Sequence, residues 1–334
     1  MQDEWLPLLW FAIIGIAIFM YVLLDGFVLG VGLLFPFAPG EDDRDLMMHS
    51  VAPIWDGNET WLVLGVGGLL AVFPIAYAIV LPALYLPFIF MLFGLVMRGV
   101  SFEFRFKSTR TRAFWNRAFQ GGSALAVIAQ GVVLGAFVHG FDMDGFVHRG
   151  GMFVWLTPFG LLTGAALLAG YALLGATWLI LKAPGELETW ARRIARPLLI
   201  AVLVFMALIS LWVPFLSDVI AQRWFSLPNL LYLSPIPLLT GATGLLCWRA
   251  IAGQQKLRPF LLAMALFTLG YAGLGISLWP NIVPHTIPYW RAAAPASSQG
   301  FLLVGAMFAV PALLAYTAYS YWVFRGKVER NGEY

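Results

Sequence analysis

The sequence predicts an all-α protein that crosses a membrane about nine times. Of its 334 residues, 61% are hydrophobic and only 11% are charged, whereas about a quarter of the residues in an ordinary soluble domain are charged. A helix of about 20 apolar residues crosses a bilayer core. The expected spans are residues 7–36, 55–73, 75–97, 118–141, 153–181, 197–216, 231–250, 258–279 and 299–324. No soluble domain is visible, so residues 1–334 are expected to form one membrane domain.

Features at the ends of the runs refine this prediction. Met1–Glu4 lacks the basic residues of a signal peptide, and the first run is too long for a signal-peptide core, so we expect an uncleaved span there. The second and third runs are separated only by Phe73-Pro74, which predicts a tight turn. Thr157-Pro158 predicts a local kink in the fifth span.

The positions of lysine and arginine predict the orientation of the chain. If the N-terminus lies outside, seventeen of the 20 basic residues fall in inside segments, and only Arg149, Arg223 and Arg291 fall outside. Basic residues are enriched on the cytoplasmic side of membrane proteins. The sequence therefore predicts an outside N-terminus, a cytoplasmic C-terminus and an odd number of spans.

A compact polar cluster, Pro53–Trp61, opens the second expected span and includes Trp55 and Asn58. Its two acids, Asp56 and Glu59, are three residues apart and share one face of a helix. One interpretation is local, with Asp56 as the N-cap of the helix and Glu59 as its partner in a capping box. The other makes the same acids the mouth of a proton path from the inside. The residues alone leave both interpretations open.

Asp25 lies within the first apolar run. An ionisable group inside a span is a functional hypothesis by default, because lipid makes it costly. A proton relay or a buried partner for an arginine would explain it, and a packing acid beside Gly26 is the structural alternative.

Arg98 and Glu103 close the third expected span. We expect Arg98 to pair with Asp25 or Asp56, and Glu103 to be a partner at the interface. Arg105 is expected to extend toward the membrane surface.

Several kinds of chemistry are not indicated. The histidines His49, His139, His148 and His285 fall in a loop or near span ends, so no pair is placed to ligate a haem in mid-membrane. The single cysteine, Cys247, excludes an internal disulfide and a cysteine metal site. Every glycine cluster lies in an apolar run, which argues against a nucleotide loop, and no nucleic-acid partner is expected.

Taken together, these segments resemble subunit II of bd-type quinol oxidases over essentially the whole chain. The blocks that carry the resemblance are Leu24–Phe27, Ala52–Leu62 and Arg98–Arg105. Later stretches resemble the cyanide-insensitive branch of that family: Arg223–Asn229, Gly273–Asn281 and Ser298–Phe301.

The resemblance implies a fold of two four-helix bundles plus one extra helix in a bacterial inner membrane. It implies a haem-bearing subunit I as partner, with haem b and a haem d-type group there and none in this chain. A small single-helix accessory subunit and a bound quinone or lipid are compatible with it, although no motif marks them. The complex would oxidise quinol on the outer side and reduce dioxygen to water with cytoplasmic protons, without pumping.

The resemblance also implies a proton path through Asp56 and Asp25, with Glu59 as a further member. Trp55, Asn58, Arg98 and Glu103 are then supporting polar or ion-pair residues, and none of these residues is expected to be catalytic. The family usually reads Asp-Gly-Phe-Asp-Leu-Gly, but the second acid is Val28 here, so no role carries over to that position. Two alternatives stay open: a proton-coupled transporter, and a purely structural assembly subunit.

Overall fold

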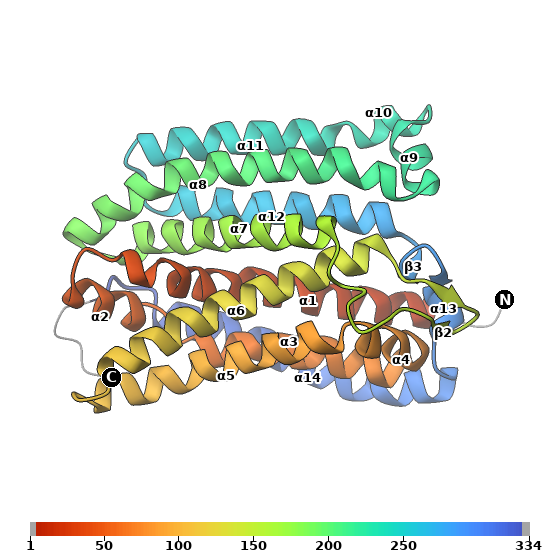
Figure 1. The fold of residues 1–334 in the computed structure, drawn as a ribbon, viewed down its shortest axis with the longest axis horizontal. Helices are drawn as coiled ribbons and strands as arrows, with labels where there is room; N and C mark the ends of the chain where they lie inside the picture. The colour runs from red at the N-terminus through yellow and green to blue at the C-terminus, as the bar shows by residue number, and fades with distance from the viewer. Residues whose placement is uncertain (1–4, 329–334) are drawn as a thin grey trace.

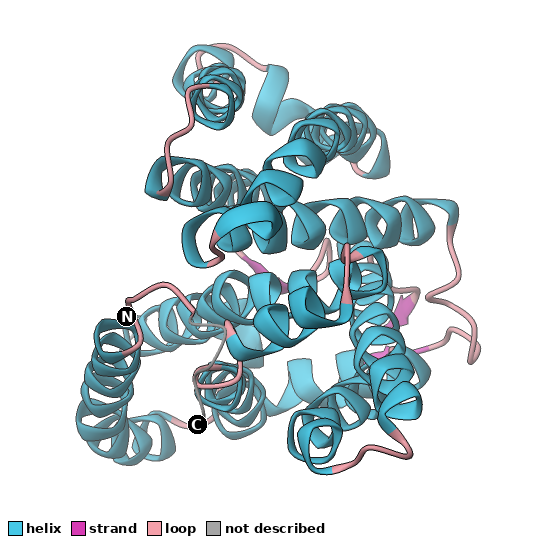
Figure 2. Cartoon of the chain, turned by 90° about the vertical axis from the view of Figure 1, so that its left-hand side faces the viewer, coloured by secondary structure: helices cyan, strands magenta, loops and turns pink. Residues whose placement is uncertain are grey.

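The computed structural model describes residues 5–328, which are almost entirely helical (Figures 1 and 2). The first half contains α1 Trp5–Leu34, η1 Phe35–Phe37, α2 Glu41–His49, α3 Trp55–Val72, α4 Pro74–Ala83, α5 Tyr85–Lys107, α6 Arg112–His139, β1 Met143–Asp144 and β2 Val147–His148. The second half contains α7 Pro158–Lys182, α8 Gly185–Trp212, η2 Val213–Leu216, α9 Asp218–Phe225, α10 Asn229–Leu233, α11 Pro235–Ala252, α12 Leu257–Leu278, β3 Asn281–Val283, β4 Ile287–Pro288, α13 Tyr289–Ala292 and α14 Ala296–Val323. The strands form two antiparallel hairpins, β1–β2 and β3–β4.

Eight helical segments within residues 5–328 are long and apolar enough to cross a membrane, one fewer than the nine that the sequence led us to expect. The difference lies in the second and third expected spans. Helix α3 begins with the polar cluster, and the run before Tyr85 forms only the ten-residue α4. The tight turn at Phe73-Pro74 is confirmed, since α3 ends at Val72 and α4 begins at Pro74.

Two local predictions were wrong. Thr157-Pro158 is the start of α7 rather than a kink within a span. The hydroxyl of Thr157 accepts a 2.9 Å hydrogen bond from the backbone N–H of Gly160, and proline suits the first helical position because no partner is needed for its nitrogen. The segment that ends at His49 is not a loop but the helix α2. Its first turn carries three acids, and negative side chains stabilise the positive N-terminal end of a helix.

Helix α1 lies at the centre and packs against α7, α3 and α6 (Figure 1). The crossing of α1 and α7 is close because glycine faces glycine. A Cβ atom on Gly30 would lie 1.8 Å from the backbone oxygen of Tyr171, and one on Gly175 would lie 2.4 Å from the carbonyl carbon of Gly30. Small residues allow membrane helices to approach in this way.

We expect Gly30→Ala to destabilise the protein by about 1–3 kcal/mol or more, because backbone rather than a flexible side chain blocks the new methyl group. Gly67→Ala is the matched control, since a Cβ atom at Gly67 on α3 meets nothing within 4 Å. The thermal unfolding midpoint of the purified protein measures both. Equal midpoints for the two variants would contradict the proposed tight crossing.

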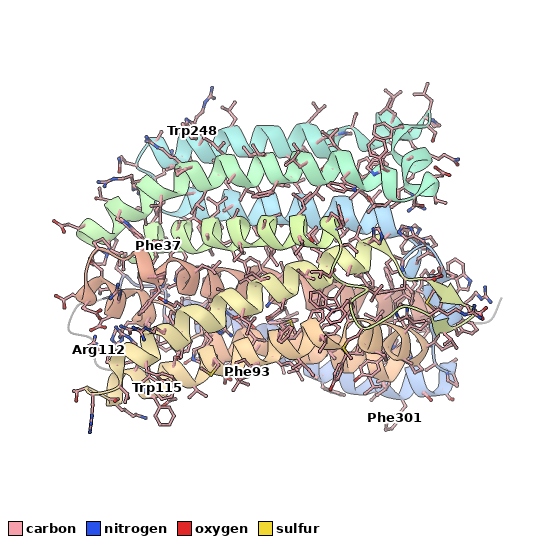
Figure 3. The ribbon with its side chains drawn as sticks, viewed as in Figure 1. Phe37, Phe93, Arg112, Trp115, Trp248 and Phe301 are labelled. Carbon is pink, nitrogen blue, oxygen red and sulfur yellow. The ribbon has the colours of Figure 1, made fainter. Side chains whose placement is uncertain are left out.

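The outside of the molecule is apolar. Large side chains such as Phe93 on α5, Trp248 on α11 and Phe301 on α14 project outward (Figure 3). An apolar surface of this extent is typical of a membrane or protein interface. The buried polar side chains lie inward of this surface, and the candidate site is built from them.

Candidate functional site

Three helices place an arginine between two acids inside the protein. Arg98 on α5 is fully buried, and its Nη1 donates a 2.7 Å hydrogen bond to Oδ1 of Asp25 on α1, which is also fully buried. Its Nη2 forms an ion pair with Glu59 on α3, whose side chain is 28% exposed. We call these three residues the triad. Of the two acids offered to Arg98 by the sequence, the structure pairs it with Asp25 and brings Glu59 in place of Asp56.

The helical repeat explains why Arg98 points inward. The buried residues of α5 follow one face at spacings of three and four residues: Pro87, Met91, Gly94, Leu95, Arg98, Ser101, Phe102 and Arg105. Arg98 and Arg105 therefore both lie on the core side of α5. The cost of burying a guanidinium is offset only where acids and acceptors meet it, which is the situation of both residues.

The helical repeat also places the two acids of α3 on different sides of the helix. Asn58 and Trp61 lie on the buried face, so Glu59 lies at its edge and Asp56 points away and is exposed. The N-cap of α3 is Ile54, without a side-chain hydrogen bond, and Asp56 is the second helical residue. The capping-box interpretation of Asp56 and Glu59 was therefore wrong. Asp56 lies nearer the surface than the triad and makes no ion pair within residues 5–328.

The supporting residues have distinct positions. The ring of Trp55 lies 5.9 Å from the guanidinium of Arg98 and stacks on Phe102. Asn58 donates a 2.8 Å hydrogen bond to the backbone oxygen of Leu24 and accepts one of 3.0 Å from Tyr321. These contacts tie α3 and α14 to the segment of α1 that carries Asp25. Glu103, in contrast, is exposed and pairs with Lys107, away from the triad.

A second set of polar residues, not found from the sequence, continues inward from Asp25. Tyr21 lies one helical turn before Asp25 on the same side of α1, and both residues are buried. Gln130 on α6 donates a 2.8 Å hydrogen bond to the hydroxyl of Tyr21, and Tyr171 on α7 donates one of 3.0 Å to Gln130. All these side chains are buried. The four-residue spacing between Tyr21 and Asp25 on α1 could have indicated Tyr21 as a neighbour of Asp25. No sequence signal links Gln130 and Tyr171 to Tyr21.

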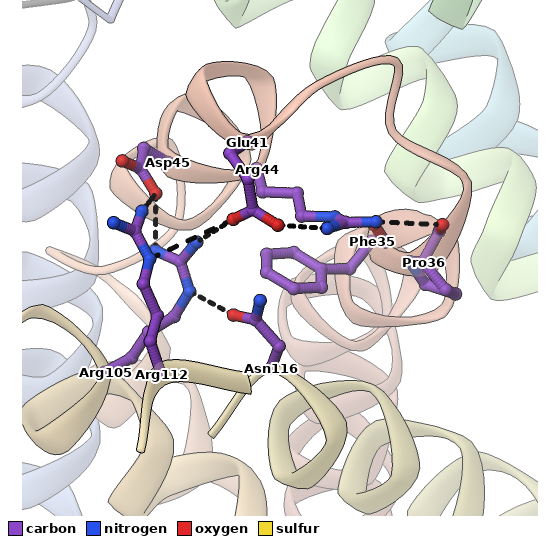
Figure 4. Close-up of polar contacts among 8 residues, drawn as sticks. All are labelled: Phe35, Pro36, Glu41, Arg44, Asp45, Arg105, Arg112 and Asn116. Carbon is purple, nitrogen blue, oxygen red and sulfur yellow. Dashed lines mark hydrogen bonds and ion pairs between the residues drawn. The ribbon is translucent and has the colours of Figure 1, made fainter. Parts of the chain in front are cut away.

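An ion-pair cluster holds α2 against α5 and α6 (Figure 4). Arg105 is buried, donates a 2.6 Å hydrogen bond to Asn116 and lies 2.6 Å from Asp45. Arg112 pairs with the same carboxylate of Asp45, while Glu41 pairs with Arg44. The expectation that Arg105 extends toward the surface was wrong, because its seven-residue distance from Arg98 places it on the same buried face.

Asp45 makes this cluster sensitive to acid. Partial burial favours a higher pKa, but hydrogen bonds from Arg112 and Arg105 outweigh it and hold the pKa of Asp45 below its usual value of 3.8. The stabilisation is therefore complete above about pH 4 and is lost as the pH falls through the lowered pKa.

We expect Asp45→Asn to lower the free energy of unfolding by about 1 kcal/mol at pH 7, a small value because the carboxylate is partly exposed. The difference from the wild type should shrink as the pH is lowered below about 4. Thermal unfolding midpoints between pH 7 and about pH 2.5 measure this, with Asp42→Asn at an exposed position of α2 as the control. A difference that stays constant with pH would contradict the ionic explanation.

The histidines lie apart from the triad. His49 ends α2, His139 ends α6, His148 lies in β2, and His285 lies between β3 and β4, where its ring contacts the backbone oxygen of Val138. Within residues 5–328, no group of three or more histidine, cysteine or acidic side chains is arranged to hold a metal ion.

The fold and the site together define a multi-pass helical membrane protein with a buried ionisable network. A family model for cytochrome bd terminal oxidase subunit II matches residues 6–324. The chain therefore belongs to the cytochrome bd terminal oxidase subunit II family, and the resemblance noted from the sequence is confirmed. It is a subunit of a bacterial cytochrome bd oxidase.

Relatives match over nearly their whole length. Cytochrome bd-I ubiquinol oxidase subunit 2 of Escherichia coli (strain K12) is 28% identical over 375 residues, covering 98% of this chain and 96% of the relative. Cytochrome bd ubiquinol oxidase subunit 2 of Bacillus subtilis (strain 168) is 27% identical over 337 residues, covering 97% of each. A chain in the structure of the bd oxidase from Geobacillus thermodenitrificans matches with a TM-score of 0.78 at 14% identity, covering 96% of this chain and 98% of that chain, which shows a shared fold.

Proposed function

We propose that this chain is the haem-free subunit of a quinol:oxygen oxidoreductase and that its triad holds part of a cytoplasmic proton path. The observation that carries the proposal is the buried arrangement of Asp25, Arg98 and Glu59. Reduction of dioxygen to water consumes protons, and a buried reaction centre needs a polar route to them. Two acids between a partly exposed position and the protein interior are suited to this role.

The charges of the triad favour the binding of one proton. With both acids ionised, two negative charges face one positive charge, so the group carries a net charge of −1 inside the membrane region. One bound proton makes it neutral, and a neutral group is favoured where the dielectric constant is low. Arg98 cannot itself give up a proton. It is therefore a positioning residue that holds Asp25 and Glu59 in place, while the proton resides on an acid.

The order of exposure suggests the direction of transfer. Asp56 is exposed, Glu59 is partly exposed, and Asp25 is fully buried. A proton would enter near Asp56 and Glu59 and reach Asp25, with water carrying it past the fixed charge of Arg98. The hydroxyl of Tyr21 and the amide of Gln130 extend the polar chain beyond Asp25.

The wider proposal concerns assembly and orientation. The N-terminus lies outside and the C-terminus in the cytoplasm, in agreement with the distribution of basic residues. The chain is one membrane domain of two four-helix bundles plus an extra helix, in which α3 is the ninth helix beside the eight more apolar segments. The partner is a subunit I that carries haem b and a haem d-type group, and this chain supports its assembly. The quinol and oxygen sites belong to that partner, a small accessory subunit can join them, and the names of the relatives indicate ubiquinol as the quinol class.

The first test is to purify the complex from its native membrane with a tag on this chain. We expect haem absorption bands together with a second large membrane subunit. A colourless, intact and folded single chain would overturn the oxidase proposal. The family assignment already argues against the transporter alternative. A purely structural role for the triad remains the competing proposal, since the same ion pairs join α1, α3 and α5, and the effect of Asp25→Asn on turnover separates the two.

A further inference from the structure

A separate cavity of about 220 Å³ lies at the end of the molecule that carries α2. Its lining comes from the end of α2, the end of α7 and the segment that follows α14, including His49, Trp178, Lys182, Gly326 and Lys327. A water molecule occupies about 30 Å³, so a tetrahedral anion and several waters fit. None of the described lining residues carries a carboxylate, so this cavity is chemically unlike the triad.

Lys182 brings an unbalanced charge to the cavity. It is 5% exposed, and its Nζ donates hydrogen bonds to the backbone oxygens of Phe324 and, at 3.0 Å, Gly326. No ion pair joins it to an acid within the described part of the chain. An ammonium group has three N–H donors, so one is left over after the two carbonyls. A buried cation without an anionic partner is costly, and an anion in the cavity would lower that cost.

Two further donors belong to the same lining. Lys327 donates 3.0 Å hydrogen bonds to the backbone oxygen of Ala183 and to Glu188, which again leaves one N–H group. The indole Nε1 of Trp178 is buried and has no hydrogen-bond partner in the structure. A buried donor of this kind normally has a partner. Among residues 5–328, three of the residues that line this cavity therefore each carry an N–H group without a protein acceptor.

The local charge balance also favours an anion. Glu188 pairs with both Lys327 and Arg192. When Lys182 is counted, this part of the described chain therefore has one carboxylate for three cations. The negative C-terminal ends of α2, α7 and α14 reach the cavity, and the positive N-terminal end of α3 borders it. Because a helix end carries only about half a unit charge, these ends offset part of the positive side-chain charge and do not cancel it.

We propose that this cavity binds a phosphate group through Lys182, Lys327 and Trp178. Its oxygens are acceptors for several N–H donors at once, and lysine is a common partner for it. The group belongs either to the headgroup of an anionic phospholipid or to free phosphate. The exposed side chain of Trp322 and the guanidinium of Arg325, 4.9 Å from its ring, lie in the adjoining segment, as expected near a membrane interface.

The test uses the delipidated complex that contains this chain. Its unfolding midpoint is measured against inorganic phosphate, with chloride at the same ionic strength as reference, and in micelles with phosphatidylglycerol or phosphatidylcholine. A ligand that binds the folded state raises the midpoint. In Lys182→Met we expect at least tenfold weaker binding of the active probe, equal to about 1.4 kcal/mol. Lys107→Met, which changes an exposed lysine at the end of α5, should bind as the wild type does.

The two probes separate the sources of the phosphate group. Stabilisation by phosphatidylglycerol alone indicates a lipid headgroup, and stabilisation by inorganic phosphate indicates a free anion site. Trp178→Phe keeps an aromatic ring, although a smaller one, and removes the N–H group. It should weaken binding a few fold, and it serves as the test if Lys182→Met does not fold. The proposal is overturned if neither probe stabilises the wild type, or if both variants respond as the wild type does.

Discussion

Replacing Arg98 with methionine is expected to remove most of the assembled complex from the membrane. Methionine fills similar space but leaves Asp25 buried without a cation and Glu59 beside it with the same charge. Loss of one partner of a buried ion pair costs about 3–5 kcal/mol, a large part of the stability of a typical protein. The yield of complex recovered by the tag, together with its unfolding midpoint, measures this loss.

A second substitution tests whether the loss is electrostatic. In Arg98→Met combined with Asp25→Asn, the uncompensated buried charge is gone, so much of the stability should return. Arg110→Met, at an exposed position after α5, is the control and should assemble normally. If Arg98→Met assembles as well as this control, the triad does not hold the helices together. If the double variant is no better than the single one, packing rather than charge explains the loss.

Asp25→Asn is expected to lower oxidase turnover at least tenfold while leaving the complex assembled. Arg98 keeps its ion pair with Glu59, and the remaining pair is neutral, so the protein tolerates the change. Asparagine has nearly the same shape but cannot accept and release a proton at neutral pH. Oxygen consumption with excess quinol measures the turnover, after the amount of complex has been matched by haem absorbance.

The pH profile of turnover separates a proton-transfer role from a structural one. A slow proton step makes the residual rate of Asp25→Asn rise as the pH is lowered, whereas a structural defect scales the profile uniformly. Glu59→Gln should act in the same direction, and Asp56→Asn less strongly because Asp56 is exposed. Asp144→Asn, at an exposed acid in β1, is the control. Full turnover in assembled Asp25→Asn and Asp56→Asn complexes would establish the structural alternative.

The sequence predicted much of the fold because composition and helix length are local properties. Each of the eight apolar segments overlaps an expected span, although Tyr85–Lys107 lies ten residues beyond 75–97, and the turn at Phe73-Pro74 was correct. The errors arose where apolar length alone is ambiguous. The expected span 75–97 joined the short α4 to the first part of α5. The start of α7 was taken for a kink because Thr157-Pro158 fits both.

The candidate site shows the same division. Asp25, Glu59 and Arg98 were recognised from the sequence because ionisable groups are rare in apolar runs. Their partners were not, since pairing depends on which helix faces meet. The close approach of α1 and α7 at Gly30 brings Tyr171 to the polar chain of Asp25, and no local pattern encodes that meeting. Arg105 was misplaced because a basic residue near a span end suits both the surface and an ion pair with Asp45.

The sequence by itself therefore determined the class of protein, its membrane segments and the acids that need an explanation. These features follow from the high cost of burying charge in lipid, which makes charged residues rare in membrane-spanning runs. Only the tertiary structure decided that Glu59 rather than Asp56 meets Arg98, that α2 is held by Arg105, and that Lys182 lines a cavity whose described residues carry no carboxylate. These depend on distances between residues far apart in the chain, which the packing of the helices sets.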